Sequence, residues 1–459
     1  MKNLTFENLR EITGGKLVGK QFDDGREITA IVWDSRKIVP GCLFLCIEGE
    51  KVDGHDFAQQ AVDNGAAGVV AEKKIPGLKV PYILVDSVLQ ATQEIAAYYR
   101  RALGLTVVGV VGSVGKTSTK EMIAATLKKT YRVSKTKGNF NNQWGVPFTI
   151  FGLNEGDQVA VIEMGIGDFG EMDVLSSIAQ PDIVVMTNIG QSHLEFLKTR
   201  DGILKAKSEV FNHMNPEGHV IINGDDDKLC TIKNVNGKKP ESYGFGPDAQ
   251  VTAERIVTDG FAGSQFDVVI RQGGGKMSFH ACLPVSGRHM IYNALAAVQV
   301  ALDLNVPLLS IKEGLNSVSV VEGRNNLIHT DRFTLIDDCY NASPTSMQSS
   351  VDFLQYAKGR KVAILGDMLE LGADSDKYHF KVGQYVGGTA TDLIICVGEE
   401  SEKMFMGAKL TTDHQVEYFK TLQDAINMVP DMLKDGDTVL LKASNSMHFK
   451  ELLEVLKKL

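Results

Sequence analysis

The stretch that most constrains the fold is VVGVVGSVGKTST, at residues 107–119. An apolar strand pattern leads into its glycines, and a helix pattern, STKEMIAATLKK, follows Lys116 and Thr117. A strand, a glycine turn, Lys-Thr and a helix are the context in which a helix N-terminus binds phosphate. The stretch differs from the longer G-x-x-x-x-G-K-[ST] loop, because Val110 occupies the position of the first glycine.

The residues of this loop predict contacts to a nucleotide. Gly112 and Gly115 let backbone N–H groups approach a phosphate. Lys116 can reach the β- and γ-phosphates, and Thr117 can offer its hydroxyl to Mg²⁺. The alternative is a glycine-rich turn that ends a core strand and binds nothing. The remaining residues of the predicted ATP-binding loop are Ser113, Val114 and Ser118.

The alternation of strand and helix patterns predicts an α/β protein with three domains. In the central part, unbroken apolar strands each precede a helix, which is typical of a parallel sheet covered on both faces, as in P-loop ATPases. Strands with Gly-rich turns then predict an antiparallel appendage. The last part alternates strands and helices again, as in a Rossmann-like, doubly wound sheet. The predicted domains are residues 1–103, 104–312 and 313–459.

Composition excludes several classes of protein. The 459 residues allow about three domains with cores of their own. With 43% apolar and 23% charged residues the chain is globular, and a net charge of −9 disfavours broad binding to nucleic acid. We see no signal peptide and no run of roughly 18 apolar residues, so we expect a cytoplasmic protein without a membrane span. The six scattered cysteines are interpreted as buried, reduced thiols rather than zinc ligands.

Several other residues are candidate magnesium ligands. Glu163 ends the strand VAVIE, where a carboxylate would project beside the loop, although it could be an ordinary strand-end charge. His193 follows another strand end, in TNIGQSHLE, and a lone loop histidine is often structural. Lys205 and Lys207 lie on an amphipathic helix pattern and, from the residues alone, are solvated helix lysines.

Ordered motifs along the whole chain resemble the Mur ligase family, ATP-dependent enzymes that form amide bonds in peptidoglycan synthesis. The family's loop is the short G-x-x-G-K-[ST], so Val110 is expected there. The N-terminal DSRKIVPGCLFLCIEGEKVDGHDF is similar to a uridine-nucleotide-binding segment of the family. The central motifs are GSVGKT, TKGNFNNQWGVP, EMG, TNIGQSHLE and AKSE, and the third part contains IDDCYNASPTSM and LGDMLELG.

The resemblance implies a role for each matched residue. Lys116 binds phosphate; Thr117 and Glu163 hold a first Mg²⁺, and His193 with a carbamylated Lys207 holds a second. Lys207, not Lys205, matches the A-K-x-x-[VIL] pattern of the family, and CO₂ turns its repelling ammonium into an oxygen donor. The resemblance also implies catalytic roles for Asn139, Asn142 and Arg324. Asn293 would contact the adenine of ATP, and Asp338 would contact the ribose. The residues implied to contact the UDP substrate are Asp34, Ser35, Arg36, Asp53, Gly54, His55 and Asn141.

The third-part motifs are similar to the branch of the family that joins D-alanyl-D-alanine to UDP-N-acetylmuramoyl-tripeptide. The implied reaction passes through an acyl phosphate and uses ATP and two Mg²⁺ ions, in a monomer. Ser343, Ala443 and Trp144 depart from the family pattern on the acceptor side. The alternatives are a UDP-N-acetylmuramoyl-dipeptide ligase, folylpolyglutamate synthase, and a non-ligase P-loop ATPase or scaffold. The DSR and DGHDF motifs argue against folylpolyglutamate synthase, which does not need a uridine-nucleotide domain.

Overall fold

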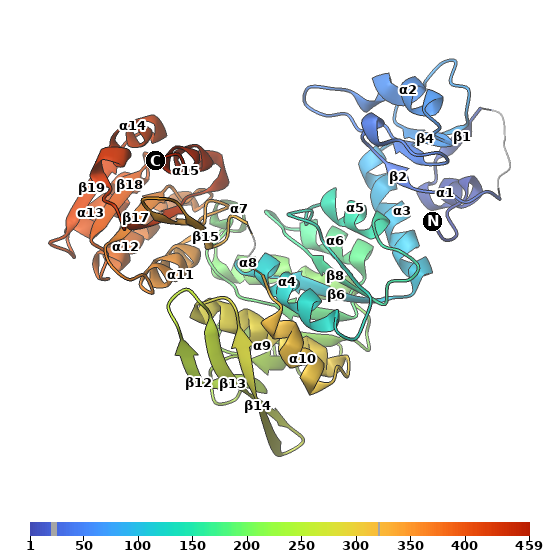
Figure 1. The fold of residues 1–459 in the computed structure, drawn as a ribbon. Helices are drawn as coiled ribbons and strands as arrows, with labels where there is room; N and C mark the ends of the chain where they lie inside the picture. Colours follow the sequence, from blue (N-terminus) through green and yellow to red (C-terminus); the bar gives the residue numbers. More distant parts are fainter. Residues whose placement is uncertain (20–24, 320–321) are drawn as a thin grey trace.

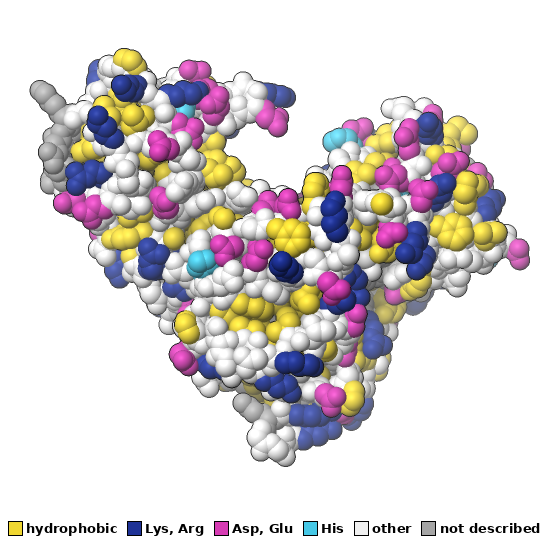
Figure 2. All heavy atoms as spheres, turned by 180° about the vertical axis from the view of Figure 1, so that it is seen from behind, with side chains coloured by type: hydrophobic (Ala, Val, Ile, Leu, Met, Phe, Trp, Pro, Cys, Tyr) yellow, Lys and Arg dark blue, Asp and Glu magenta, His cyan; other side chains and the backbone are white. Residues whose placement is uncertain are grey.

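Three β-sheets follow one another along the chain, and each forms the centre of one lobe (Figure 1). The computed structural model describes residues 1–19, 25–319 and 322–459. The N-terminal and C-terminal lobes stand apart above the central one, which gives the molecule a V shape (Figures 1 and 2). The predicted α/β architecture with three domains is confirmed.

The N-terminal lobe has a five-stranded sheet in the order β1-β5-β4-β3-β2. Four strands are parallel, and β1 runs antiparallel to β5 at the edge. The helix α3 leads out of this lobe into the central one (Figure 1). The elements are α1 (Phe6–Thr13), β1 (Lys16–Val18), β2 (Ile31–Val32), β3 (Leu43–Leu45), α2 (Ala58–Asp63), β4 (Gly68–Ala71), β5 (Tyr82–Leu84) and α3 (Val88–Leu103).

The central lobe has a nine-stranded sheet in the order β14-β13-β12-β11-β10-β9-β6-β8-β7. Its strands from β7 to β12 are parallel, and β12, β13 and β14 form the predicted antiparallel part. The elements are β6 (Thr106–Val111), α4 (Lys116–Leu127), β7 (Val133–Lys135), α5 (Gly145–Phe151), β8 (Val159–Glu163), α6 (Glu171–Ala179), β9 (Ile183–Met186), α7 (Leu194–Leu197), α8 (Arg200–Ser208), β10 (His219–Asn223), β11 (Glu241–Tyr243), β12 (Val251–Thr258), β13 (Ser264–Gln272), β14 (Gly275–Leu283), α9 (Arg288–Asp303) and α10 (Leu308–Asn316).

The C-terminal lobe has a six-stranded sheet in the order β15-β16-β20-β17-β18-β19, parallel except for β15. Helices cover both faces of this sheet, as the doubly wound pattern predicts. The elements are β15 (Asn326–His329), β16 (Thr334–Asp337), α11 (Pro344–Leu354), β17 (Lys361–Gly366), α12 (Ser375–Gly387), β18 (Leu393–Val397), α13 (Ser401–Lys409), β19 (Gln415–Phe419), α14 (Leu422–Met432), β20 (Thr438–Lys442) and α15 (Lys450–Leu456).

Two hydrophobic cores cover the two faces of the central sheet. One is continuous with the N-terminal lobe, because α3 packs against α1 on one side and against α5 and α6 on the other. The second lies under α4, α9 and α10. Burial on both faces explains why β6, β8 and β9 read as unbroken apolar runs. The phosphate loop therefore starts from a strand that is fixed on both sides.

The second predicted domain division, after residue 312, falls inside α10. This helix packs against α4 and β14, so it belongs with the central sheet. The period of its apolar residues does not distinguish a last helix of one domain from a first helix of the next. We therefore propose that the third domain begins after Asn316, and that the first ends near Leu103, where α3 ends.

The surface charges and the cysteines can be compared with the compositional expectations where the structure describes them. Acidic and basic side chains are interspersed on the face shown in Figure 2 rather than gathered into one basic patch. Four cysteines are buried, namely Cys42, Cys46, Cys339 and Cys396. The other two, Cys230 and Cys282, are partly buried. None of the described helices is long and apolar enough to cross a bilayer.

Candidate active site

The phosphate loop lies where three strand ends meet. Val110 of β6 is fully buried and pairs with Glu163 of β8, and the next residue, Val111, pairs with Met186 of β9. Val110 is thus a core strand residue, and the loop begins at Gly112. This explains why the sequence lacks the first glycine of the longer loop. The carboxyl ends of parallel strands are the usual ligand edge of such a sheet.

Two glycines of the loop have no simple substitute. Gly112 has φ +154°, and a Cβ atom there would lie 1.9 Å from Oγ1 of Thr187. Gly115 has φ +84° and directly precedes Lys116, the first residue of α4. A positive φ is costly for residues with a Cβ atom. The two glycines therefore let the loop turn sharply onto the N-terminus of α4, the end that attracts anions.

Lys116 lies over its own loop. Its Nζ donates to the carbonyl oxygens of Gly112, at 2.9 Å, and Ser113, at 3.4 Å. Burial lowers the pKa of Lys116; the carboxylate of Glu163 opposes this effect, and the charge of Arg324 adds to it. The positive charges of Lys116, in the central lobe, and Arg324, in the C-terminal lobe, therefore act on the same region beside the loop. A phosphate group there would relieve their mutual repulsion.

A buried carboxylate lies beside the loop. Glu163 is 1% exposed, and its Oε1 accepts from the hydroxyl of Thr117 at 3.1 Å and from Nδ2 of Asn141 at 2.8 Å. Its Oε2 is buried without a hydrogen-bond partner among the described residues, with Nζ of Lys120 at 3.5 Å. An unsatisfied buried carboxylate oxygen next to a hydroxyl and an amide suits a hard cation that takes oxygen ligands. The residues present therefore fit Mg²⁺.

Lys207 and His193 lie in unusual surroundings. Lys207 is 1% exposed, and burial, with the nearby charge of Lys116, lowers its pKa well below the ordinary lysine value. The expectation of a solvated lysine from the helix pattern is therefore wrong for Lys207, whereas Lys205 is exposed. His193 has φ +61°, and its Nδ1 lies 2.6 Å from Oε2 of Glu370 in the C-terminal lobe. Strained backbone at a non-glycine residue often marks a functional site.

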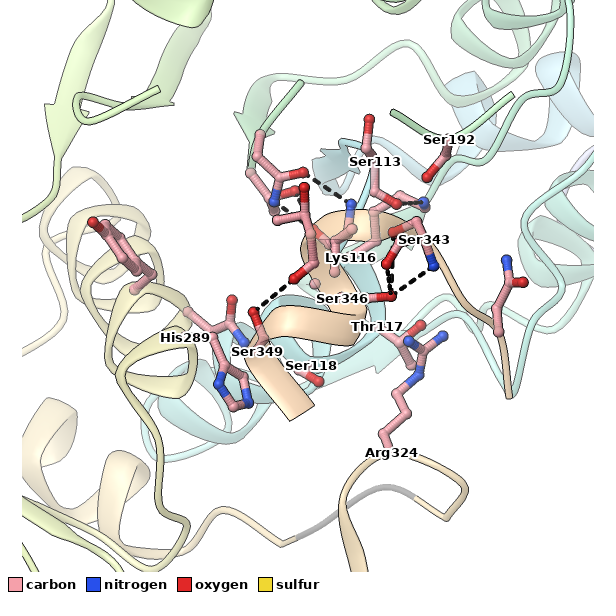
Figure 3. A pocket seen from close by; sticks show the side chains of 18 of the residues that line it. Ser113, Lys116, Thr117, Ser118, Ser192, His289, Arg324, Ser343, Ser346 and Ser349 are labelled. Carbon is pink, nitrogen blue, oxygen red and sulfur yellow. Dashed lines mark hydrogen bonds between the residues drawn. The ribbon is translucent and has the colours of Figure 1, made fainter. Parts of the chain in front are cut away.

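Lys116, Glu163 and His193 border a cavity of about 910 Å³ between the central and C-terminal lobes, whereas Lys207 is not among the residues that line it. Figure 3 shows Lys116, Thr117 and Ser118 of the loop and α4, with Arg324 and the serines Ser343, Ser346 and Ser349 of the C-terminal lobe turned into the same space. A cavity of this size accommodates a nucleotide-sized ligand. The predicted site residues that line it are Ser113, Val114, Gly115, Lys116, Thr117, Ser118, Asn141, Asn142, Glu163, His193, Asn293, Arg324 and Asp338.

Predicted residues of the C-terminal lobe reach the cavity with their polar atoms already engaged. Asp338 is 7% exposed; its Oδ2 accepts from Nζ of Lys442 at 2.6 Å and from the hydroxyl of Ser350. The guanidinium of Arg324 lies over the ring of Tyr340, 4.3 Å from its centroid. Asp338 is thus a buried, paired carboxylate, and Arg324 is held at the cavity by an aromatic face.

The predicted asparagines differ in where they lie relative to the cavity. Asn141, assigned to the UDP substrate, donates to Glu163 and so lies on the phosphate side of the site. Oδ1 of Asn142 accepts from the backbone N–H groups of Trp144 and Gly145, where α5 begins. Asn139 is exposed and does not line the cavity, whereas Asn293 accepts from Thr119 at 3.0 Å, behind the loop. A sequence motif predicts the position of the loop in the chain, but it does not predict which asparagine side chain of that loop points into the cavity.

Apart from Asn141, the predicted uridine-nucleotide residues lie in the N-terminal lobe and do not line the cavity. Arg36 forms a two-point pair with Asp34, at 2.8 and 2.9 Å, and its side chain is 85% exposed. The imidazole of His55 is engaged at both nitrogens: Nδ1 lies 2.6 Å from Asp53, and Nε2 accepts from the backbone N–H of Glu72 at 3.0 Å. His55 therefore shapes its turn, while Arg36 faces solvent.

Comparisons with known proteins agree with this geometry. The family models described as Mur ligase family catalytic domain, Mur ligase middle domain and Mur ligase glutamate ligase domain match residues 27–100, 110–301 and 323–445. The UDP-N-acetylmuramoyl-tripeptide–D-alanyl-D-alanine ligase of Bacillus subtilis is 35% identical over 456 residues, 98% of this chain and 97% of that protein. The chain belongs to the Mur ligase family.

Further similarities extend over the full length of this Mur ligase. The Escherichia coli ligase of the same name is 33% identical over 463 residues, 100% of this chain and 99% of that protein. A crystal structure of MurF from Acinetobacter baumannii matches with a TM-score of 0.90 and 33% identity, covering 99% of both chains. A MurF ligase from Thermotoga maritima in complex with ADP matches with a TM-score of 0.81 and 28% identity, covering 94% of this chain and 97% of that one.

Two residues near the site of this Mur ligase escaped the sequence reasoning. Lys120 is fully buried on α4 and lies 3.5 Å from Glu163; its place one helical turn after Lys116 is the signal that could have identified it. Glu370, which holds His193, lies in LGDMLELG, a motif used only to recognise the family. Its partner is 177 residues away in sequence, so no local pattern connects them.

The three departures from the family pattern each have a packing role in this Mur ligase. The backbone N–H of Ser343 donates to Ser346 at 2.9 Å, within a capping box at the start of α11. Trp144 packs beside Phe148, which stacks on Trp33 of the N-terminal lobe with ring centroids 3.6 Å apart. Ala443 is fully buried after β20.

Proposed function

We propose that this Mur ligase joins D-alanyl-D-alanine to the terminal carboxylate of UDP-N-acetylmuramoyl-tripeptide, using ATP, in the synthesis of the peptidoglycan precursor. The observation that carries the proposal is the cavity, where Lys116 of the loop and the carboxylate of Glu163 meet Arg324 of another lobe. The full-length similarity to ligases of that name supports the substrate assignment. An enzyme that uses ATP and a UDP-linked precursor works in the cytoplasm, and we propose that it acts as a monomer.

In the first step the γ-phosphoryl group of ATP passes to an oxygen of the tripeptide carboxylate, giving an acyl phosphate and ADP. A carboxylate is a poor electrophile until one of its oxygens becomes a good leaving group. Lys116 and Arg324 approach the site from two lobes and neutralise the charge of the transferred group. The contribution of the protein is positioning and electrostatic stabilisation, as in other phosphoryl transfers.

Two groups of side chains would hold magnesium ions. Thr117 and Glu163 would bind the first, because a hydroxyl and a partly unsatisfied carboxylate already meet there. His193 would bind the second with the carbamate of Lys207. When bound, Mg²⁺ neutralises the phosphate charge as a Lewis acid. Asn141 steadies Glu163 by donating to its Oε1.

The surroundings of Lys207 support its conversion to a carbamate. Only the neutral amine reacts with CO₂, and burial favours that form. The protonated side chain would carry a second positive charge near Lys116 with no carboxylate to compensate it among the groups that shift its pKa. The carbamate replaces this repulsion with an attraction.

In the second step the free amine of D-alanyl-D-alanine attacks the acyl carbon. The amine nitrogen forms the new bond and loses a proton, and inorganic phosphate leaves from the tetrahedral intermediate. Water competes with the amine for the acyl phosphate, so the cavity must close over it. The pair His193–Glu370 and the hydrogen bond from Thr345 to Gln191, at 2.8 Å, already join the two lobes at its rim. Closure around ATP is therefore part of the proposal.

The N-terminal lobe would bind the uridine nucleotide. Arg36 presents an exposed guanidinium, which suits a diphosphate, with Asp34 and Ser35 beside it. Asp53, Gly54 and His55 would shape the neighbouring turn, in which the backbone N–H of His55 donates to Asp53 at 2.9 Å. The nucleotide would then anchor the substrate at a distance from the reacting carboxylate.

The test is ADP release with UDP-linked tripeptide as substrate, measured with and without D-alanyl-D-alanine. We expect rapid, stoichiometric turnover only when both substrates are present, together with formation of the UDP-linked pentapeptide. ADP release that does not depend on the dipeptide would overturn the proposal in favour of a plain ATPase. Release that depends on glutamate and a folate would favour folylpolyglutamate synthase.

A further inference from the structure

A cluster of metal-ligating side chains lies in the central lobe, outside the lining of the cavity. It contains His219 at the start of β10, Glu241 at the start of β11 and Asp303 at the end of α9. The strands β10 and β11 pair in parallel, so their first residues come to the same edge of the sheet. One ligand atom from each residue lies within 4.8 Å of the other two.

The carboxylates are oriented by one amide. Nε2 of Gln299 donates to Oε2 of Glu241 and, at 3.0 Å, to Oδ1 of Asp303. The second oxygen of each carboxylate is the one nearer the imidazole: Nδ1 of His219 lies 2.9 Å from Oε1 of Glu241 and 3.9 Å from Oδ2 of Asp303. Two carboxylate oxygens and one ring nitrogen therefore converge on a single small volume.

Asp303 gives an independent sign that this volume suits a ligand. Its side chain is only 8% exposed, and its Oδ2 is buried with no hydrogen-bond partner among the described residues. Such an oxygen loses its hydration and gains nothing in return. The neighbouring carboxylate of Glu241 adds repulsion, which one histidine shared between two carboxylates does not fully offset.

We propose that His219, Glu241 and Asp303 bind a divalent transition-metal ion of the Zn²⁺ class, at a site separate from the magnesium site. Imidazole together with two carboxylates suits Zn²⁺ better than Mg²⁺, which favours oxygen ligands. Ligands about 2.1 Å from a tetrahedral ion lie about 3.4 Å apart, between the 2.9 Å and 3.9 Å observed. The side chain of His219 is 47% exposed, so water completes the coordination.

Such an ion would join three elements of the central lobe. It would tie the end of α9 to the first residues of β10 and β11, which lie far apart in sequence. The same helix carries Asn293, which packs behind the phosphate loop. Gln299 would act as the outer-shell group that orients both carboxylates. The ion has no place in the ligation itself, so the inference stands or falls independently of the proposed function.

The test is calorimetric titration of the untagged full-length chain with Zn²⁺, in saturating Mg²⁺ so that the oxygen-rich site is filled. We expect the wild type to bind one more Zn²⁺ ion per chain than His219→Ala or Asp303→Asn does. If the variants still bind that ion, their affinity for it should be at least about tenfold lower than that of the wild type. Gln299→Ala keeps all three ligands and should weaken binding about 10- to 100-fold. The control is His280→Ala, because His280 is similarly exposed and, among the described residues, pairs only with Asp267, at 3.0 Å.

Two further readouts separate a metal site from a proton-sharing triad. Co²⁺ bound to the wild type should give visible absorption that His219→Ala lacks and His280→Ala keeps. Zn²⁺ should raise the midpoint of thermal unfolding of the wild type and of His280→Ala only. Equal stoichiometry and affinity for Zn²⁺ in the wild type and in His219→Ala would overturn the proposal and leave the cluster as a hydrogen-bonded triad.

Discussion

Replacing Lys207 by methionine should make this Mur ligase more stable and almost inactive. The aliphatic part of Lys207 is already buried at 1% exposure, and methionine has a similar length, so packing changes little. What disappears is an amine that burial and the charge of Lys116 keep from being protonated. On folding at neutral pH the buried amine has to give up the proton that it carries in the unfolded chain, and an apolar side chain avoids this cost. We expect a gain of about 1–3 kcal/mol in the free energy of unfolding.

The gain should depend on pH with a definite sign. The pKa of Lys207 is lowered in the folded state, so the unfolded chain binds a proton at neutral pH that the folded chain disfavours. The wild type therefore becomes more stable as the pH rises from the folded-state pKa toward the ordinary lysine value of about 10.4. Lys207→Met lacks this dependence, so its advantage should be largest near pH 7 and should shrink toward pH 10.

Urea unfolding at pH 7 and pH 10, together with the ligation assay, checks both effects. Lys207→Met should lose at least about 10²-fold in kcat, because it cannot form the proposed carbamate ligand. Lys207→Ala should regain part of its activity with a short carboxylic acid, which would take the place of the proposed carbamate. The matched control is Lys205→Met on the exposed face of the same helix, with little change in either measurement. A destabilised Lys207→Met variant with full activity would refute the reasoning.

Three other substitutions test the remaining geometry. Gly112→Ala places a Cβ atom 1.9 Å from Oγ1 of Thr187, so we expect the free energy of unfolding to fall by about 1–3 kcal/mol and ATP to bind more weakly. The double variant Gly112→Ala/Thr187→Ala should recover part of both losses. Unchanged stability and unchanged ATP affinity in Gly112→Ala would contradict the clash. Glu163→Gln should weaken Mg²⁺-dependent ATP binding at least about tenfold without unfolding the protein, whereas unchanged affinity in a magnesium titration would exclude Glu163 as a ligand. Glu370→Gln should lower kcat about 10- to 100-fold, because His193 loses the carboxylate at 2.6 Å, and should raise the magnesium concentration needed for activity. A drop in thermal stability alone would mean that this pair is only structural.

The fold and the phosphate loop were predictable because their signals are local. A strand buried on both faces has to be apolar throughout, and a loop that brings its backbone to a phosphate needs glycine at Gly112 and Gly115. Val110 also fits this explanation, since a residue in the last part of a core strand has no reason to be glycine. Glu163 followed from its place at the end of the neighbouring strand.

The side-chain environment of the site was not predictable in the same way. The helix pattern made Lys207 a solvated residue, because nothing local reveals that α8 turns it inward beside Lys116. The direction of Asn141 depends on loop geometry that a motif does not encode. Glu370 reaches His193 only when two lobes meet, and α10 belongs to the central domain only because of what it packs against. Long-range packing decides each of these cases.

The central claim, that the cavity transfers phosphate to a carboxylate and not to water, is tested most directly by oxygen labelling. UDP-linked tripeptide with ¹⁸O in both oxygens of its terminal carboxylate would be turned over with ATP and D-alanyl-D-alanine, and the released phosphate analysed by mass spectrometry. An acyl phosphate requires one carboxylate oxygen to leave with the phosphate, so each phosphate should contain one ¹⁸O and each new amide the other. Unlabelled phosphate released together with the ligated product would contradict the account.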